Sequence, residues 1–169
     1  MKKILALLIL FSAAVLFPAS ASSHATTLQT SIMPYPFWVA PEDGDIYHIP
    51  TGLKLSFEGM MDMVSGSRIV YIGETHTNIH AHRVQFEILR DLERRYPGRI
   101  ALGMEMFRTP QQASLDRWTR GELSEMDFLR ESSWFDNWGS NFSYYRDIMD
   151  FALDRGMDVI ALNPPRELQ

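Results

Sequence analysis

The sequence predicts an α/β fold in which a parallel sheet core is flanked by helices. Three apolar runs, at residues 68–74, 99–105 and 158–163, have the length and the β-branched or aliphatic content of strands buried on both faces. Helical segments separate the runs, and this alternation is typical of a parallel sheet. Ligands of such sheets bind beyond the carboxyl ends of the strands, so the polar residues that end the runs are expected to surround one crevice. These residues are Glu74, Glu105 and Asn163.

Two segments precede the predicted domain. Residues 1–21 match a secretory signal peptide, with two lysines, an apolar stretch and a small-x-small cleavage pattern. The apolar stretch is too short to span a bilayer, and no later window reaches a transmembrane length. Residues 22–44 are expected to be a flexible leader, because they are rich in Ser, Thr and Pro for most of their length and lack periodicity. The α/β domain is expected to cover residues 45–169.

The remaining elements follow from local patterns. Residues 45–55 suit a small β-hairpin, because a Pro-Thr-Gly turn separates two short apolar segments. The clearest helix spans residues 78–96, where apolar residues recur at helical spacing until Pro97-Gly98 ends it. Shorter helices are expected from Ser56, from Thr109-Pro110, from Ser124 and over about residues 143–155.

Composition excludes several classes of function. The chain has a formal net charge of −5, and removal of the signal peptide with its lysines makes it more negative, which argues against a nucleic-acid partner. It contains no cysteine, so it has neither a disulfide framework nor a thiolate metal site. No cysteine is available for lipidation either, and the exported product is therefore expected not to be a lipoprotein.

The turn Gly73-Glu74-Thr75-His76 is the leading candidate site, because it joins the first long strand to the clearest helix. A helix N-terminus attracts carboxylate or phosphate groups through its free N–H donors and the helix dipole. Alternatively, Glu74 and His76 only satisfy the turn, although two ligand-type side chains within three residues favour a function. His82 can lean toward the strand ends, whereas His80 points about 200° away around a helix. We therefore favour His82 over His80 as a binding residue.

Further candidates follow the second and third strands. Glu105 ends an apolar run, so its carboxylate is expected to be desolvated and to need a cation as partner. Asn163-Pro-Pro-Arg166 is a rigid turn that could aim Asn163 and Arg166 into the same crevice, or could be an ordinary exposed turn.

Two polar side chains interrupt predicted apolar surfaces. Gln85 lies in the middle of the buried helix face and is expected to bond Glu74, Glu105 or a loop carbonyl, because a buried amide without partners is costly. Tyr145 belongs to an aromatic cluster whose role is either packing or a ligand wall, and a tyrosine oxygen can ligate haem iron.

Taken together, these motifs resemble the ChaN-like haem-binding family, which belongs with the Tiki and erythromycin-esterase-like proteins. The resemblance is carried by Gly73-Glu74-Thr75-His76, His82 with Gln85, Leu102-Gly-Met-Glu105-Met-Phe107 and Asn163-Pro-x-Arg166. It implies an α/β domain in the cell envelope and a role in haem or iron acquisition. It also implies that a dimer binds haem, with a tyrosine on the iron and His or Lys contacts to the propionates; Tyr145 is the candidate tyrosine. Family members are longer, so an incomplete domain is expected.

The first hypothesis is therefore a periplasmic or envelope-associated haem-binding protein that functions in iron uptake, forms a homodimer and contacts haem through His76, His82, Tyr145, Asn163 and Arg166. The alternative is a metal-dependent hydrolase or protease of the Tiki type, in which Glu74, His76 and Glu105 hold Mn, Co or Fe and activate a water. A third alternative is a nonfunctional fragment of a longer protein. The sequence leaves open whether the protein is an enzyme.

Overall fold

The computed structural model describes residues 3–7 and 41–168. The described residues divide into two compact units, one formed by residues 3–7 and 64–168 and the other by residues 41–63. Most of the predicted signal peptide, and the leader as far as residue 40, lie outside the described residues.

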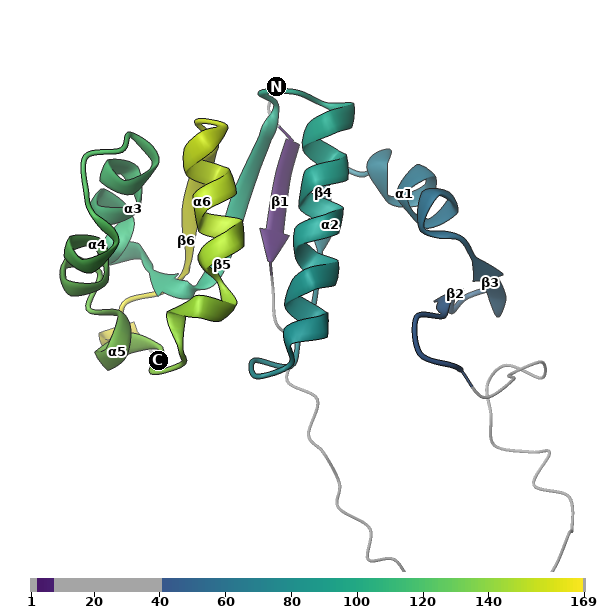
Figure 1. Cartoon of the computed structure of the whole chain (residues 1–169), viewed down its shortest axis with the longest axis horizontal. Coiled ribbons are helices and arrows are strands. Elements are labelled where there is room, and N and C mark those ends of the chain that lie inside the picture. The colour runs from purple at the N-terminus through teal and green to yellow at the C-terminus, as the bar shows by residue number, and fades with distance from the viewer. Residues whose placement is uncertain (1–2, 8–40, 169) are drawn as a thin grey trace, which may run out of the picture. The chain divides into compact units, whose positions relative to one another are not determined.

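The larger unit contains a four-stranded, fully parallel sheet with the order β4-β1-β5-β6 (Figure 1). The predicted parallel sheet core is thus confirmed. Three of its strands come from the predicted apolar runs, and the fourth, β1, comes from within the predicted signal peptide. The strands are β1 (Lys3–Leu7), β4 (Ile69–Tyr71), β5 (Ile100–Arg108) and β6 (Asp158–Asn163).

The long strand β5 forms the centre of the core. Leu102 and Met104 are almost fully buried and pair in register with Val159 and Ala161 of β6. Burying one such side chain contributes about 1.5–3 kcal/mol. The register shifts between Met104 and Arg108, so that Arg108 lies opposite Asn163. This irregularity lies where the carboxyl ends of the strands approach the candidate site.

Helices α2 (Ile79–Arg95) and α6 (Arg146–Asp154) lie on the same side of the sheet (Figure 1). The Asn78 side chain caps α2 by accepting from the N–H groups of His80 and Ala81. Past the end of α2, Gly98 adopts a φ of +66°, a left-handed conformation that favours glycine. The remaining helices of this unit are α3 (Gln112–Thr119), α4 (Glu125–Glu131), α5 (Trp134–Asn137) and the short 3-10 helices η1 (Thr109–Gln111), η2 (Phe142–Tyr144) and η3 (Arg166–Leu168).

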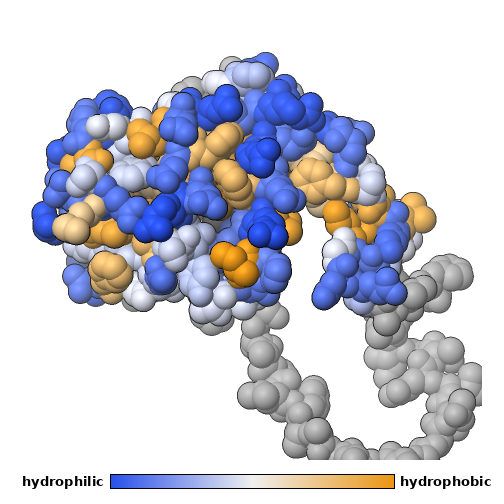
Figure 2. All heavy atoms as spheres, in the orientation of Figure 1, coloured by the Kyte–Doolittle hydropathy of each residue, from blue (hydrophilic) through white to orange (hydrophobic). Residues whose placement is uncertain are grey.

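Aromatic rings fill the space between the sheet and helices α4 and α5. Phe107, Phe128, Trp134 and Phe142 are all at most 3% exposed, and their ring centroids lie 5.2–6.0 Å apart in successive contacts. Tilted and edge-to-face contacts of this kind add to the energy of burial itself. The helical face turned toward the viewer in Figure 2 is mostly hydrophilic, with apolar residues in small patches.

The smaller unit contains the predicted hairpin. Strands β2 (Ile46–His48) and β3 (Leu53–Leu55) pair antiparallel, with Tyr47 opposite Lys54. Lys54 forms an ion pair with Asp45 at 2.5 Å, and the Tyr47 hydroxyl donates to the same carboxylate at 3.0 Å. Helix α1 (Phe57–Ser65) follows in the chain. Within the described residues, every helix is too short or too polar to cross a membrane.

Candidate functional site

The candidate site is built around the carboxylate of Glu74, on the turn between β4 and α2. Its side chain has no exposed surface. The Tyr145 hydroxyl donates to Oε1 at 2.8 Å, and His76 Nδ1 lies 3.1 Å from the same oxygen. His82 Nδ1 lies 2.9 Å from Oε2. A turn, a helix and a distant tyrosine therefore meet at one buried carboxylate.

His82 is held between this carboxylate and the backbone. Its Nε2 lies 3.0 Å from the carbonyl oxygen of His76, and since a carbonyl only accepts, that nitrogen carries the hydrogen. Its ring stacks on Tyr144 with centroids 5.3 Å apart. The side chain of His82 is 3% exposed, and although Nδ1 is close to Glu74, the two atoms are not aligned as a hydrogen bond. His82 is thus a buried neighbour that fixes the position of the His76 backbone.

Tyr145 is buried and stays protonated. Burial raises the pKa of its phenol, and the hydrogen bond to Glu74 and the nearby Glu74 charge raise it further. The charge of Glu105 adds to this effect, which places Glu105 near the same group. The hydroxyl also accepts from Trp138 Nε1 at 3.0 Å. With 0% exposure and a raised pKa, Tyr145 does not fit the expected iron ligand, because a tyrosine binds iron as the phenolate.

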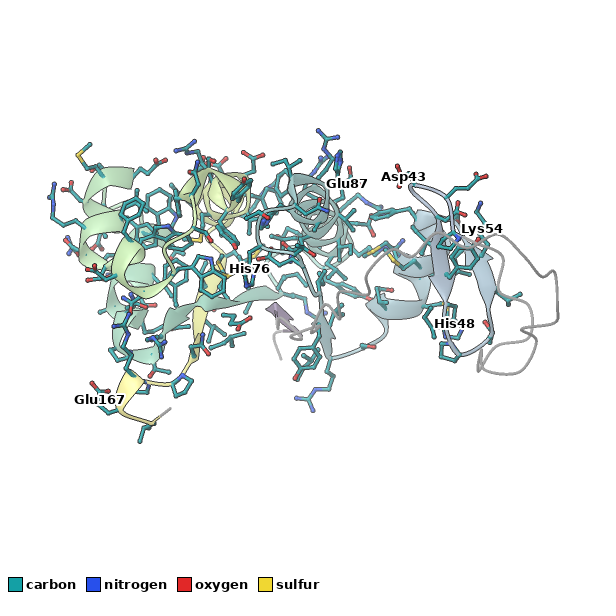
Figure 3. The ribbon with its side chains drawn as sticks, turned by 90° about the horizontal axis from the view of Figure 1, so that it is seen from below. Asp43, His48, Lys54, His76, Glu87 and Glu167 are labelled. Atoms are coloured by element: carbon teal, nitrogen blue, oxygen red, sulfur yellow. The ribbon has the colours of Figure 1, made fainter. Side chains whose placement is uncertain are left out.

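His76 is the member of the cluster that reaches solvent. Its side chain is 38% exposed, and its ring packs edge-on against Trp138 with centroids 4.7 Å apart. Figure 3 shows His76 among side chains from several elements of the larger unit, whereas the labelled His48 belongs to the hairpin. With Nδ1 directed at Glu74, His76 Nε2 has no partner among the described residues. A histidine oriented by a carboxylate through one nitrogen is well prepared to bind a metal through the other.

The candidates on β5 and β6 form a second group. The Asn163 amide donates to the backbone carbonyl of Glu105 at 2.6 Å, so these two strand ends are in contact. Glu105 is half-buried, and its negative charge contributes to the raised pKa of the Tyr145 phenol. Arg166 is exposed and its guanidinium donates to the carbonyl of Asp136 at the end of the aromatic cluster. Arg166 therefore ties η3 to α5, and no hydrogen bond of the described structure joins it to the Glu74 cluster.

The geometry does not support the metal-hydrolase alternative. Among the described residues, no group of three or more His, Asp or Glu side chains is arranged to hold a metal ion. Glu74 and His76 are close to each other, but the oxygens of Glu74 already face His76, His82 and Tyr145. The described geometry therefore gives no support to a ligand shell of Glu74, His76 and Glu105.

Some features of the site differ from the expectation or were missed. Gln85 is 1% exposed, but both of its amide atoms lack a hydrogen-bond partner in the described structure, so it does not bond Glu74 or Glu105. Trp138 was not singled out from the aromatic cluster of Tyr145, although it contacts both His76 and Tyr145. Tyr71, at the end of β4, is 59% exposed.

A pocket of about 300 Å³, which His82 helps to line, adjoins the cluster. Ile79, Phe86 and Ile148 provide apolar surface, and two arginines of α2 lie at the pocket as well. Acidic residues line it too, so its charges are mixed. The arginines are Arg83 and Arg90, and the acidic residues are Glu87 and Asp147.

Comparisons with known proteins assign the chain to a family. A family model described as haem-binding uptake, Tiki superfamily, ChaN matches residues 60–169. The fold is similar to that of ChaN of Campylobacter jejuni, solved in a study of cofacial haem binding, with a TM-score of 0.63 and 19% sequence identity. That match covers 75% of this chain and 52% of the other, so the chain spans about half the length of that relative. No curated protein matches significantly. The chain belongs to the ChaN haem-binding uptake family of the Tiki superfamily.

Proposed function

We propose that this protein binds haem through the imidazole of His76 and acts in haem or iron acquisition in the cell envelope. The observation that carries the proposal is the orientation of His76: Nδ1 faces a buried carboxylate, and Nε2 is left without a partner on a partly exposed ring. Imidazole nitrogen is a common axial ligand of haem iron, and a carboxylate on the far nitrogen fixes the ring and raises its basicity.

The surroundings of His76 suit a flat, apolar ligand. Trp138 provides an aromatic wall beside the imidazole, and it is fixed by donating to the buried Tyr145 hydroxyl. When bound, haem would supply the redox and ligand chemistry of its iron. Glu74 would orient the His76 ring, and Tyr145 would hold Glu74 in place. In this arrangement Tyr145 is a positioning residue and has no direct contact with iron.

The cellular setting rests on the amino-terminal sequence. A signal peptide at residues 1–21 would direct the chain across the inner membrane, to the periplasm or the envelope. Cofacial haem binding by the Campylobacter jejuni relative supports a dimer in which two haems face each other. We propose the same homodimeric arrangement here, and light scattering with and without haem would measure the mass of the assembly.

A haemin titration of the purified protein tests the binding proposal. We expect a shifted Soret band that saturates at a fixed ratio of haem to protein. The His76→Ala variant should bind haemin at least about 10–100-fold more weakly, because loss of the ligand costs no less than loss of its outer-shell partner. His80→Ala is the matched control, because His80 is exposed and its side chain makes no hydrogen bond with any described residue. A Soret change that does not saturate, or equal affinities of the two variants, would overturn the proposal.

A further inference from the structure

Strands β4 and β5 follow each other in the chain with α2 between them, but a third strand separates them in the sheet. Strands β4 and β5 do not pair with each other, because β1 lies between them (Figure 1). On one side Ile4–Ala6 pair with Ile69–Tyr71, and on the other Lys3–Leu7 pair with Ile100–Met104. All of these pairings are parallel. The position between β4 and β5 is thus defined by ladders on both of its sides.

The strand that occupies this position lies within the segment expected to be removed on export. Loss of residues 1–21 would leave the facing N–H and C=O groups of β4 and β5 without partners. Ile100 and Leu102 of β5 are at most 4% exposed, so these backbone groups belong to the core. An unpaired backbone group in such a place is costly, which favours a replacement strand.

The β6 edge of the sheet is closed by a side chain. The Gln112 amide donates to the carbonyl of Val159 at 2.8 Å and accepts from the N–H of Ala161, also at 2.8 Å. A single amide therefore pairs with β6 as a neighbouring strand would. Strand addition at β6 is blocked at this point, whereas the position between β4 and β5 is suited to a strand.

We propose that export turns the space between β4 and β5 into a strand-acceptor site for a parallel, extended and apolar polypeptide segment of about five residues. This inference rests on the proposed function, because it requires that residues 1–21 are a signal peptide and are removed on export. The length follows from the five paired residues on β5, and the direction follows from the parallel ladders on both sides. Backbone hydrogen bonds provide the affinity in this mode of recognition, and the apolar sequence Ile4-Leu-Ala-Leu7 shows which composition fits.

The test begins with the protein recovered after export, whose amino terminus is determined by intact-mass spectrometry. A peptide of residues 2–8 is then added, and hydrogen exchange is followed in Ile69–Tyr71 and Ile100–Met104. The control peptide carries Leu5→Pro, which removes a backbone donor from the centre of the strand. We expect saturable protection of both segments by the first peptide only, with β6 unchanged as the internal reference.

Three results would overturn the proposal: retention of residues 1–21 in the exported protein, no protection by the first peptide, or equal protection by both peptides. The haemin titration is read separately. A protein that binds haem but not the peptide refutes the strand-acceptor site alone, and one that binds the peptide but not haem refutes the haem proposal alone.

Discussion

Replacing Tyr145 by phenylalanine removes one hydroxyl and leaves the ring in place, so the change isolates the contact with Glu74. The hydroxyl donates to the buried carboxylate at 2.8 Å and accepts from Trp138 at 3.0 Å. Hydrogen bonds to charged groups contribute about 1.5–3 kcal/mol. Trp138 is half-buried and can regain part of its hydrogen bonding from water. We expect Tyr145→Phe to lower the free energy of unfolding by about 2 kcal/mol.

Urea unfolding followed by tryptophan fluorescence measures this change. With a urea m-value of about 2 kcal/mol per molar, a loss of about 2 kcal/mol lowers the midpoint by about 1 M at constant m. The loss should be the same across neutral and mildly alkaline pH, because burial and the Glu74 contact raise the pKa of Tyr145 and keep the phenol protonated.

Tyr144→Phe is the matched control for this prediction. Tyr144 is adjacent in sequence and stacks on His82, but its hydroxyl makes no hydrogen bond with any described residue. Its midpoint should stay close to that of the wild type. If the two variants lose equal stability, or if Tyr145→Phe changes the free energy by less than about 0.5 kcal/mol, the argument that Tyr145 anchors Glu74 fails.

Further predictions concern the carboxylate, the sheet edge and one ion pair. Glu74→Gln should weaken haemin binding about 10–100-fold, measured by Soret titration, while Glu87→Gln on the exposed side of α2 should leave it unchanged. Gln112→Leu removes both hydrogen bonds to β6 and should lower the free energy of unfolding by about 1–3 kcal/mol; an unchanged urea midpoint would contradict the edge-closing role. Burial raises the pKa of Asp91, but hydrogen bonds from the guanidinium groups one turn further along α2 outweigh this effect, and the net pKa lies below its ordinary value. A lowered folded-state pKa gives stability that is present above the unfolded-state pKa and lost as the pH falls through the folded-state value. Asp91→Asn should therefore cost about 1 kcal/mol near neutral pH and less at about pH 2, as urea midpoints at the two pH values would show.

Local sequence patterns were sufficient for most of the larger unit. The runs that end near Glu74, Glu105 and Asn163 form parallel strands, because β-branched and aliphatic residues without polar alternation suit a sheet buried on both faces. The helix predicted over residues 78–96 forms as Ile79–Arg95, since its cap and its Pro97-Gly98 stop are both local signals.

The order of the strands in the sheet could not be predicted from these local patterns. Residues Lys3–Leu7 are an apolar run after two lysines, and this composition fits an export signal as well as a buried strand. Their place between β4 and β5 depends on pairing with residues more than sixty positions away. Such contacts leave no periodic trace in either partner.

The site was predictable only in part, for the same reason. Glu74 and His76 could be identified because they share one turn after a strand. The Tyr145 hydroxyl reaches Glu74 across 71 residues of sequence, so neither its burial nor its raised pKa could be derived locally. Gln85 was expected to be satisfied by the rule for buried amides, yet its amide atoms have no partner in the described structure.

The most direct test of the account is the coordination of iron in the ferric haem complex, followed by absorption and electron paramagnetic resonance spectra. Wild type, His76→Ala and Tyr71→Phe are compared side by side, because Tyr71 is the exposed tyrosine at the end of β4. The account predicts that His76→Ala alone changes the iron spectrum. A spectrum that changes with Tyr71→Phe, or that stays the same in His76→Ala, would contradict the claim that His76 binds the iron.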